Sequence, residues 1–250
     1  MIAITRDLAK QIADAELTHM KRVPIDYGRA AQQHEEYRDA LRSLGVEVIV
    51  IPADERHPDC VFIEDTAIVL DEVAVITRPG AESRRGEVDA VAEEVARIRP
   101  LVRIESPATI DGGDVLVLNN RIYVGLSSRT NEEALAQLAR LTGREVIAVN
   151  VTGALHLKTA ITRVSDDTLL VNREWLDVAP FAGWKLIDVH RDEPFGANAL
   201  LVGDTVIYPT AFPKTRAKLE EHGLNVRGID ADELAKAEGG VTCCCLLAMR

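Results

Sequence analysis

The sequence predicts a mixed α/β fold in which a strand–strand–helix–strand unit repeats around a ring. Pairs of apolar strands with short polar turns recur along the chain at a period of roughly 45 residues, which is typical of propellers and arrays. The apolar segments Ile2–Thr5 and Val241–Met249 supply strands for a fifth unit that is split between the two ends of the chain. Pairing these two segments would close the ring. An ordinary mixed α/β sheet is the alternative.

The first two units follow one another in the first half of the chain. The first consists of strands Thr66–Leu70 and Val73–Thr77, a helical stretch Arg84–Ile98 and strand Leu101–Ile104. The second consists of strands Asp114–Leu118 and Arg121–Gly125, helix Asn131–Leu141 and strand Val146–Val149. In each, apolar residues change from strand-like runs to helical spacing and back.

The third and fourth units are opened by further hairpins, and the fifth is completed near the N-terminus. The third begins with strands Lys158–Val164 and Thr168–Asn172, and the fourth has strands Asn198–Val202 and Thr205–Pro209 and helix Lys214–Glu221. The split unit adds helix Arg29–Leu44 and strand Val46–Ile51. We therefore expect residues 1–250 to form a single domain.

Composition restricts the classes of partner. With 250 residues, 47% of them hydrophobic, the chain is long enough for a large core. A net charge of -11 argues against nucleic acid and anionic membranes as main partners and suits a cationic small molecule. The start of the chain lacks a signal-peptide pattern, and no apolar run approaches about 18 residues. The four cysteines show no CxxC spacing, which favours a reduced, cytoplasmic compartment.

Three adjacent cysteines, Cys243 to Cys245, follow a glycine pair near the C-terminus. Paired glycines allow close approach of the backbone, and Cys243 is the first side chain beyond them that can act as a nucleophile. The alternative is a buried strand in which cysteine serves as a small apolar residue. If this segment is a strand, Cys245 shares the face of Cys243 and Cys244 points away.

His156 and Asp111 stand where other hairpins begin, as Cys243 does. A ring points such positions toward its centre, which would bring a nucleophile, a base and an orienting acid together. A Cys–His pair can attack an electrophilic carbon, with histidine as acid and then base. The alternatives are a core histidine between leucines for His156 and a tight turn at Asp111-Gly112-Gly113.

Charged residues that could bind a substrate lie in two further groups. Asp59 and Glu64 flank an apolar stretch, and a pocket holding these carboxylates would suit a guanidinium, which offers a fork of donors. Arg84 and Arg129 could each bind a carboxylate through two hydrogen bonds. The ordinary expectation for all four is a solvated surface position.

Six segments, in order and over nearly the whole chain, resemble the dimethylarginine dimethylaminohydrolase family. They are PDCVFIED (58–65), ITRPGAESRR (76–85), IDGGDVL (110–116), GLSSRTN (125–131), LHLKT (155–159) and GGVTC (239–243). This family belongs to the guanidine-modifying superfamily. The resemblance therefore implies a five-bladed, pseudo-symmetric β/α propeller, or pentein fold, in agreement with the repeat.

The resemblance also implies roles for individual residues. Cys243 corresponds to the nucleophile, His156 to the acid/base and Asp111 to the carboxylate that orients it. The residues expected to bind substrate are Leu17, Asp59, Phe62, Glu64, Asp65, Arg84 and Arg129. Leu17 matches a leucine of a mobile lid, and the irregular stretch 16–26, which contains Pro24, is predicted to be a loop.

The implied reaction is hydrolysis of an Nω-methylated arginine to citrulline and an alkylamine, a C–N bond cleavage in a linear amidine. Cys243 would form a covalent thiouronium with the substrate, and neither cofactor nor metal is needed. The resemblance also suggests a homodimer.

Three other functions are weighed against this one. A guanidine or arginine deiminase of the same superfamily typically has Asp two residues after the histidine, where this chain has Lys158. Arginine deiminases also carry an added helical domain, for which 250 residues leave no room. A non-catalytic propeller binding protein would not need matched Cys, His and Asp residues. A metal site made of Cys243, Cys245 and His156 lacks the usual ligand spacing.

Overall fold

The computed structural model describes residues 1–249 and arranges them in five three-stranded sheets. In each sheet the middle strand pairs antiparallel with one neighbour and parallel with the other. The strands are β1 (Ile2–Arg6), β2 (Glu47–Ile51), β3 (Ala67–Val69), β4 (Ala74–Ile76), β5 (Leu101–Arg103), β6 (Val115–Leu118), β7 (Arg121–Leu126), β8 (Glu145–Asn150), β9 (Ile161–Arg163), β10 (Thr168–Val171), β11 (Lys185–Asp188), β12 (Leu200–Val202), β13 (Thr205–Pro209), β14 (Asn225–Ile229) and β15 (Leu246–Ala248).

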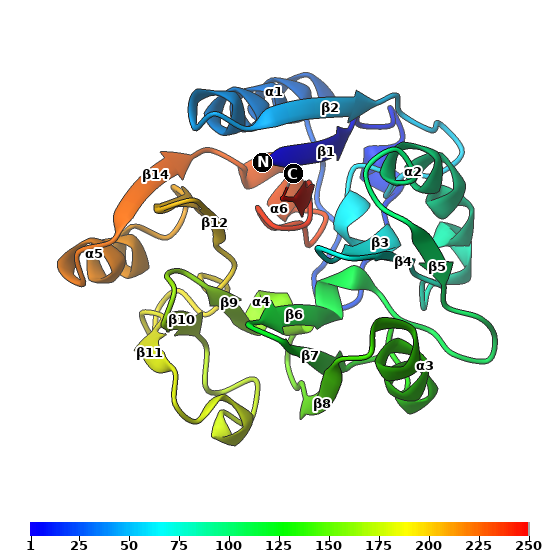
Figure 1. Cartoon of the computed structure of the whole chain (residues 1–250). Coiled ribbons are helices and arrows are strands. Elements are labelled where there is room, and N and C mark those ends of the chain that lie inside the picture. The colour runs from blue at the N-terminus through cyan, green and yellow to red at the C-terminus, as the bar shows by residue number, and fades with distance from the viewer. Residues whose placement is uncertain (250) are drawn as a thin grey trace.

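Helices join the parallel strands, because a parallel pair requires a crossover connection. The α-helices are α1 (Tyr27–Ser43), α2 (Val88–Val95), α3 (Glu132–Thr142), α4 (Leu157–Ala160), α5 (Pro213–Glu221) and α6 (Asp232–Ala235). The 3-10 helices are η1 (Ile12–Asp14), η2 (Ile63–Thr66), η3 (Glu82–Glu87), η4 (Gly112–Asp114) and η5 (Ala179–Phe181). Figure 1 shows the sheets around a common centre, with α1, α2, α3 and α5 on the outside.

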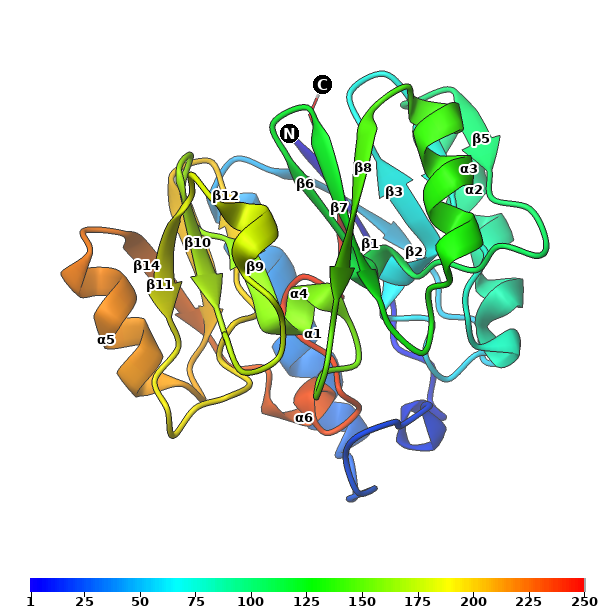
Figure 2. The ribbon, with the colours of Figure 1, turned by 90° about the horizontal axis from the view of Figure 1, so that it is seen from below.

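The predicted unit is confirmed as a mixed α/β repeat of five small sheets. The pairing of the chain ends is also confirmed, with Ile2 opposite Ala248 and Ile4 opposite Leu246. Figure 2 shows the two termini near one another, at the opposite end of the molecule from α6.

Two segments differ from the predicted strands. Residues Lys158 to Ala160 belong to the short helix α4, so the strand of that unit begins only at Ile161. Residues 241–244 form a turn, and β15 begins at Leu246. Here the Cys243 amide donates to the Gly240 carbonyl at 3.2 Å, and the Cys243 carbonyl accepts from the Glu64 amide at 3.1 Å. These bonds bend the chain before the sheet begins.

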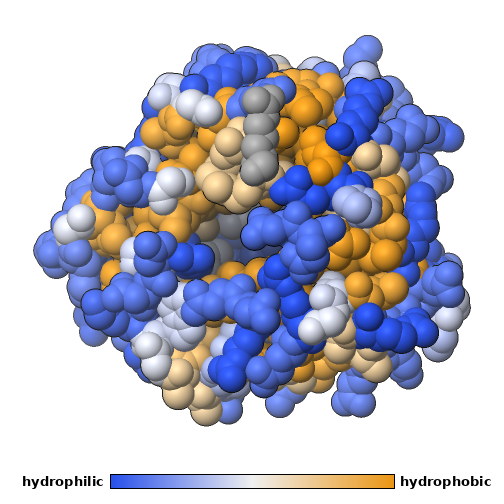
Figure 3. All heavy atoms as spheres, in the orientation of Figure 1, coloured by the Kyte–Doolittle hydropathy of each residue, from blue (hydrophilic) through white to orange (hydrophobic). Residues whose placement is uncertain are grey.

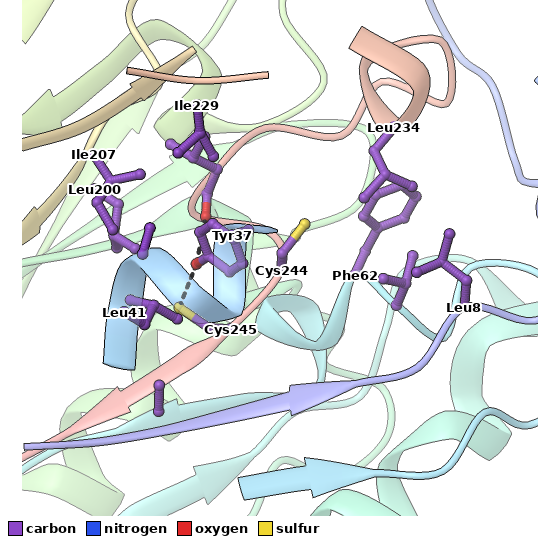
Figure 4. Close-up of a cluster of buried hydrophobic side chains, with 14 of the residues drawn as sticks. Leu8, Tyr37, Leu41, Phe62, Leu200, Ile207, Ile229, Leu234, Cys244 and Cys245 are labelled. Carbon is purple, nitrogen blue, oxygen red and sulfur yellow. Dashed lines mark hydrogen bonds between the residues drawn. The ribbon is translucent and has the colours of Figure 1, made fainter. Parts of the chain in front are cut away.

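The turn overturns the expectation that Cys243 and Cys245 share a face, since side chains alternate only along an extended strand. Cys244 and Cys245 are both buried in an apolar cluster that includes Tyr37 and Leu41 of α1. Figure 4 shows this cluster, in which the Tyr37 hydroxyl donates to Cys245 Sγ at 2.9 Å. Both residues act as small apolar side chains of the core.

Among the described residues, no helix has the length and apolar character needed to cross a bilayer.

Candidate active site

One pocket gathers residues from distant parts of the chain next to Cys243. Its lining is Glu16, Asp59, Phe62, Asp65, Arg84, Arg129, Leu155, His156, Ala237, Glu238, Gly239 and Cys243. Most of these precede a strand or lie in a loop, where side chains can point out of the sheets. The pocket therefore combines a thiol, an imidazole, carboxylates and two guanidinium groups.

Cys243 is held at the end of the turn that follows the glycine pair. Its Sγ accepts from the Gly240 amide at 3.3 Å. Burial, followed by the nearby carboxylates of Glu64 and Asp65, raises the pKa of the Cys243 thiol to about 12. The thiol is therefore protonated at neutral pH, and a cation bound beside it would favour the reactive thiolate.

The glycine pair makes room for protein side chains. A Cβ on Gly239 would overlap the Phe62 ring, and one on Gly240 would overlap the Asn198 amide. Asn198 in turn accepts from the Thr242 amide at 3.1 Å, and its own amide donates to the Thr242 hydroxyl at 3.0 Å. These contacts fix the turn that carries Cys243.

His156 lies immediately before α4 and pairs with Asp111. Its Nε2 lies 3.0 Å from Asp111 Oδ2, while Asp111 Oδ1 accepts from the Gly80 amide at 2.9 Å. Asp111 is fully buried. Gly113 packs against the other ring nitrogen, because a Cβ there would stand 2.7 Å from His156 Nδ1. This pairing orients the imidazole ring.

The charge on His156 is stabilised by several carboxylates. Burial lowers the pKa of His156, but the carboxylates of Asp65, Asp114 and Asp111 outweigh it and raise the pKa to about 9. The imidazole is therefore protonated at neutral pH and can donate a proton to a leaving group.

Asp65 and Arg84 form a buried ion pair behind the histidine. Arg84 Nη1 donates to Asp65 Oδ2 at 2.6 Å, and Gly113 donates to Asp65 Oδ1 at 2.9 Å. Burial acts to raise the pKa of Asp65, but the charges of His156 and Arg84 have the larger effect and lower the pKa to about 2. Asp65 therefore stays ionised.

Arg84 reaches the pocket, but its donors are committed to the protein. Its Nε and Nη2 bind the two oxygens of Glu87 at 3.0 and 2.8 Å, and Nη2 also donates to the Phe62 carbonyl. Glu87 thus accepts from the edge of the Arg84 guanidinium that would otherwise be available for two hydrogen bonds to a substrate carboxylate. This arrangement supports a role for Arg84 in positioning Asp65, and within the protein the guanidinium already binds two carboxylates.

Asp59 and Arg129 both form hydrogen bonds with the loop that contains residues 16–20. Both oxygens of Asp59 accept from the Glu16 amide, at 3.2 and 3.1 Å, and burial raises the pKa of this carboxyl. Arg129 Nη2 donates to Thr18 Oγ1 at 3.4 Å, and its Nη1 lies 3.9 Å from Asp111 Oδ2. Arg129 is the more accessible of the two predicted arginines.

Leu17 is half-buried in this irregular loop and does not line the pocket, whereas its neighbour Glu16 does. Phe62 lines the pocket beside Gly239.

Glu64 does not line the pocket of Cys243. Its carboxylate binds Lys158 Nζ at 2.5 Å and accepts from the Thr242 hydroxyl at 2.9 Å. Both Glu64 and Lys158 line a second pocket, whose other walls include, from each sheet, the strand that pairs antiparallel with the middle strand: β3, β6, β9, β12 and β15. Figure 3 shows a hollow near the centre of the face that it displays. The Glu64 carboxylate is engaged by Lys158, and its expected contact with a substrate stays a prediction.

Asp114 connects three parts of the site. Its Oδ1 accepts from the Leu157 amide, next to His156, at 2.9 Å. Its Oδ2 accepts from the hydroxyls of Ser127 at 2.6 Å and Thr130 at 2.7 Å. Burial raises its pKa to about 6, although His156 and the hydroxyl donors act against this.

The two hydroxyl groups extend this connection. Ser127 Oγ accepts from the Arg129 amide at 3.0 Å, and Thr130 Oγ1 accepts from the Asp111 amide at 3.2 Å. One buried carboxylate thus links the segments that carry the imidazole, its partner acid and the accessible arginine. The only signal in the sequence was a second aspartate after the glycine pair Gly112-Gly113.

Asp65, Asp111 and His156 each place one ligand atom within 4.8 Å of the others, a spacing that could surround a metal ion. Their oxygens already accept from Arg84 and from the amides of Gly113 and Gly80. We therefore assign no metal to this cluster.

Comparison with known proteins gives consistent matches over almost the full chain. The family model described as "N,N dimethylarginine dimethylhydrolase, eukaryotic" matches residues 15–250. The N(G),N(G)-dimethylarginine dimethylaminohydrolase of Pseudomonas aeruginosa is 36% identical over 245 residues, which cover 96% of each chain. The protein of the same name from Streptomyces coelicolor is 38% identical over 246 residues, covering 96% of this chain and 94% of its own.

A solved structure agrees with these matches. It is the Pseudomonas aeruginosa enzyme in a cysteine-to-serine variant complexed with citrulline, and it superposes with a TM-score of 0.92 at 35% identity, covering 98% of both chains.

Proposed function

The chain belongs to the dimethylarginine dimethylaminohydrolase family, and we propose that it hydrolyses Nω-methylated arginine to citrulline and methylamine or dimethylamine. One observation carries the proposal for this chain. Cys243 and His156 line the same pocket, together with the carboxylates Asp59 and Asp65, and the buried Asp111 pairs with His156 Nε2. A cationic, electrophilic substrate fits this combination of nucleophile, acid and negative charge.

The first half of the reaction consumes the proton of His156. The guanidinium binds near Asp65 and favours ionisation of Cys243, whose proton passes to solvent, and the thiolate attacks the guanidinium carbon. The tetrahedral adduct then loses its alkylated nitrogen, which takes the proton from the His156 imidazolium and leaves as an amine. The C–N bond breaks as the C–S bond remains, giving a thiouronium on Cys243.

The second half restores the enzyme. Neutral His156, oriented by Asp111, takes a proton from water, whose oxygen attacks the thiouronium carbon. Collapse of this adduct breaks the C–S bond, and the proton of its hydroxyl group passes to the departing sulfur, which leaves the ureido group of citrulline and the Cys243 thiol. His156 is again an imidazolium, so protons and electrons balance over the cycle.

Arg129 is the residue that we assign to the substrate's carboxylate, since the guanidinium of Arg84 is engaged by Glu87 and Asp65. Asp59 is assigned to the amino end of the substrate, and the loop 16–26 to a lid over it. We further infer that the five sheets form one closed, five-bladed pentein domain over residues 1–250, with the shared unit of β1 and β15 as its closure.

The ion pair between Glu64 and Lys158 favours an alkylated guanidine over free arginine. In deiminases of the superfamily the position of Lys158 holds an aspartate that grips an unsubstituted nitrogen. In this chain that position is Lys158, whose ammonium group forms an ion pair with Glu64. A second unsubstituted nitrogen would therefore find no additional acceptor, and deimination of arginine is the weaker alternative.

The test is a substrate panel with detection of both products. Purified protein is incubated with asymmetric dimethylarginine, monomethylarginine, arginine and agmatine, and citrulline and alkylamine are quantified. We expect kcat/KM to be highest for a methylated compound. A preference for arginine or agmatine would replace this function with a deiminase.

The nucleophile is tested separately. Cys243→Ser should remove turnover, while the matched variant Cys244→Ser at the buried neighbour should retain it, with folding of both checked by circular dichroism. Substantial turnover by Cys243→Ser would remove Cys243 from its assigned role.

A further inference from the structure

The carboxylate of Glu238 binds three consecutive backbone amides of the loop over the pocket. Its Oε1 accepts from Thr18 at 3.1 Å, from His19 at 2.6 Å and from Met20 at 2.6 Å. Amides converging on one anionic oxygen form a strong, directional contact. Glu238 also lines the pocket of Cys243.

The backbone at Glu238 adopts a conformation that favours glycine. Its φ is 60°, three residues after the end of α6, where the Gly239 amide donates to the Leu234 carbonyl and closes the helix end. Glycine takes this left-handed conformation without the steric cost borne by other residues. The contacts of the Glu238 side chain offset that cost.

The second oxygen of Glu238 is buried and, within residues 1–249, has no hydrogen-bond donor. A buried acceptor without a donor is unfavourable, and more so when it carries charge. A ligand that brings a cationic donor would satisfy it. The same pocket holds Arg129 and Asp59, so Arg129 can bind the carboxylate of an α-amino acid while Asp59 and Oε2 of Glu238 share its ammonium group.

We propose that Glu238 determines substrate specificity by holding residues 18–20 over the pocket through Oε1 and accepting the substrate's α-ammonium through Oε2. This assignment rests on the proposed function, because it takes the substrate to be an arginine derivative with a free amino end. Loop closure and recognition of the amino group are then coupled through one side chain.

The recognition half is tested with two substrates that differ only in the α-amino group. Dimethylarginine and its desamino analogue are compared for the native protein, for Glu238→Gln, which keeps an acceptor but loses the charge, and for Glu221→Gln, a control on the exposed end of α5. We expect Glu238→Gln to raise KM for dimethylarginine about tenfold or more and to leave KM for the desamino analogue unchanged. An equal rise for both substrates, or no rise, would overturn recognition of the ammonium.

A second measurement of the same contrast does not depend on turnover. Binding is also measured as protection of Cys243 against alkylation by iodoacetamide, and the same contrast between the two compounds is expected. If methylarginines are hydrolysed normally by Glu238→Gln, the proposal for Glu238 fails while the proposed function stands.

The loop-holding half has a readout that involves no substrate. Residues 16–26 contain two trypsin sites, Lys21 and Arg22. Glu238→Ala removes the acceptor of three amides, so we expect faster cleavage at these sites and faster alkylation of Cys243 than in native protein or in Glu221→Gln. If Glu238→Ala is cleaved and alkylated at the rates of the native protein, the loop contact is refuted. The thermal midpoint is the control: if it is unchanged in Glu238→Ala, faster rates come from the loop and not from global unfolding.

Discussion

The strongest quantitative prediction concerns the ionisation of Cys243 when a cation fills the pocket. In the free protein, burial and the carboxylates of Glu64 and Asp65 raise the pKa of the thiol to about 12. A guanidinium at about 4 Å, with an effective dielectric constant of about 20, stabilises a thiolate by about 4 kcal/mol. Since one pKa unit corresponds to about 1.4 kcal/mol, the pKa should fall by about three units.

This shift has a direct spectroscopic consequence. At pH 8 the thiolate fraction of Cys243 should increase about a thousandfold, from about 10⁻⁴ to about 10⁻¹, on binding of the cation. The assay is the ultraviolet absorbance of the thiolate, titrated against pH with and without saturating methylguanidinium, which lacks an amino acid end. Cys243→Ser provides the baseline, because Cys244 and Cys245 are buried in the core.

Two results would contradict this reasoning. The first is a thiolate already formed at neutral pH in the free protein, which would mean that the His156 imidazolium and not the substrate provides the stabilising charge. The second is an absorbance that does not respond to methylguanidinium at any pH. Either result would separate the ionisation of Cys243 from binding of the substrate.

Four further predictions concern neighbouring residues. Asp114→Asn removes one of the carboxylates that raise the pKa of His156, so the basic limb of the pH profile of kcat/KM should move to lower pH. The pKa of His156 rises from 6.5 to about 9 on folding, so protonated His156 adds about 3 kcal/mol of stability below pH 6.5. This stability is lost as the pH rises through about 9. In His156→Gln the free energy of unfolding should therefore vary less with pH over that range. Arg129→Lys should raise KM for dimethylarginine about tenfold with little change in kcat, because lysine cannot bind a carboxylate through a planar fork. Cys245→Ser should retain kcat/KM and change only the thermal midpoint, since Cys245 contacts the Tyr37 hydroxyl in the core.

The repeat could be predicted from sequence because each unit carries its own local signals. Apolar strand pairs, turn residues and helical spacing lie within a few tens of residues, and β6, β7 and α3 were all located in this way. The turn at 241–244 was missed because an apolar run following glycines also suits a buried strand. What bends it is the bond from the Glu64 amide to the Cys243 carbonyl, a contact between residues far apart in the chain.

The partners of the charged residues were also missed, because they too depend on contacts that the sequence does not show. The sequence and the family resemblance predict Arg84 and Glu64 as substrate contacts, but charge alone does not show which protein groups these side chains pair with. Glu87, three residues beyond Arg84, takes its guanidinium, and Lys158 takes Glu64. The roles of Asp114 and Glu238 depend on convergence of bonds from separate units, so no local pattern could reveal them.

The charge of the bound ligand also controls the ionisation of Cys243. The guanidinium of the substrate is a cation, whereas the ureido group of citrulline is neutral. Because the substrate's cation adds to the stabilisation of the Cys243 thiolate, formation of the neutral product raises the pKa of the thiol again and returns it to the protonated, unreactive form. The nucleophile is thus generated by the substrate and suppressed by the product, so citrulline should inhibit only weakly and should not form an adduct with Cys243. A stable covalent adduct of Cys243 with citrulline, detected by mass spectrometry of the intact protein, would show that this account of the pocket is wrong.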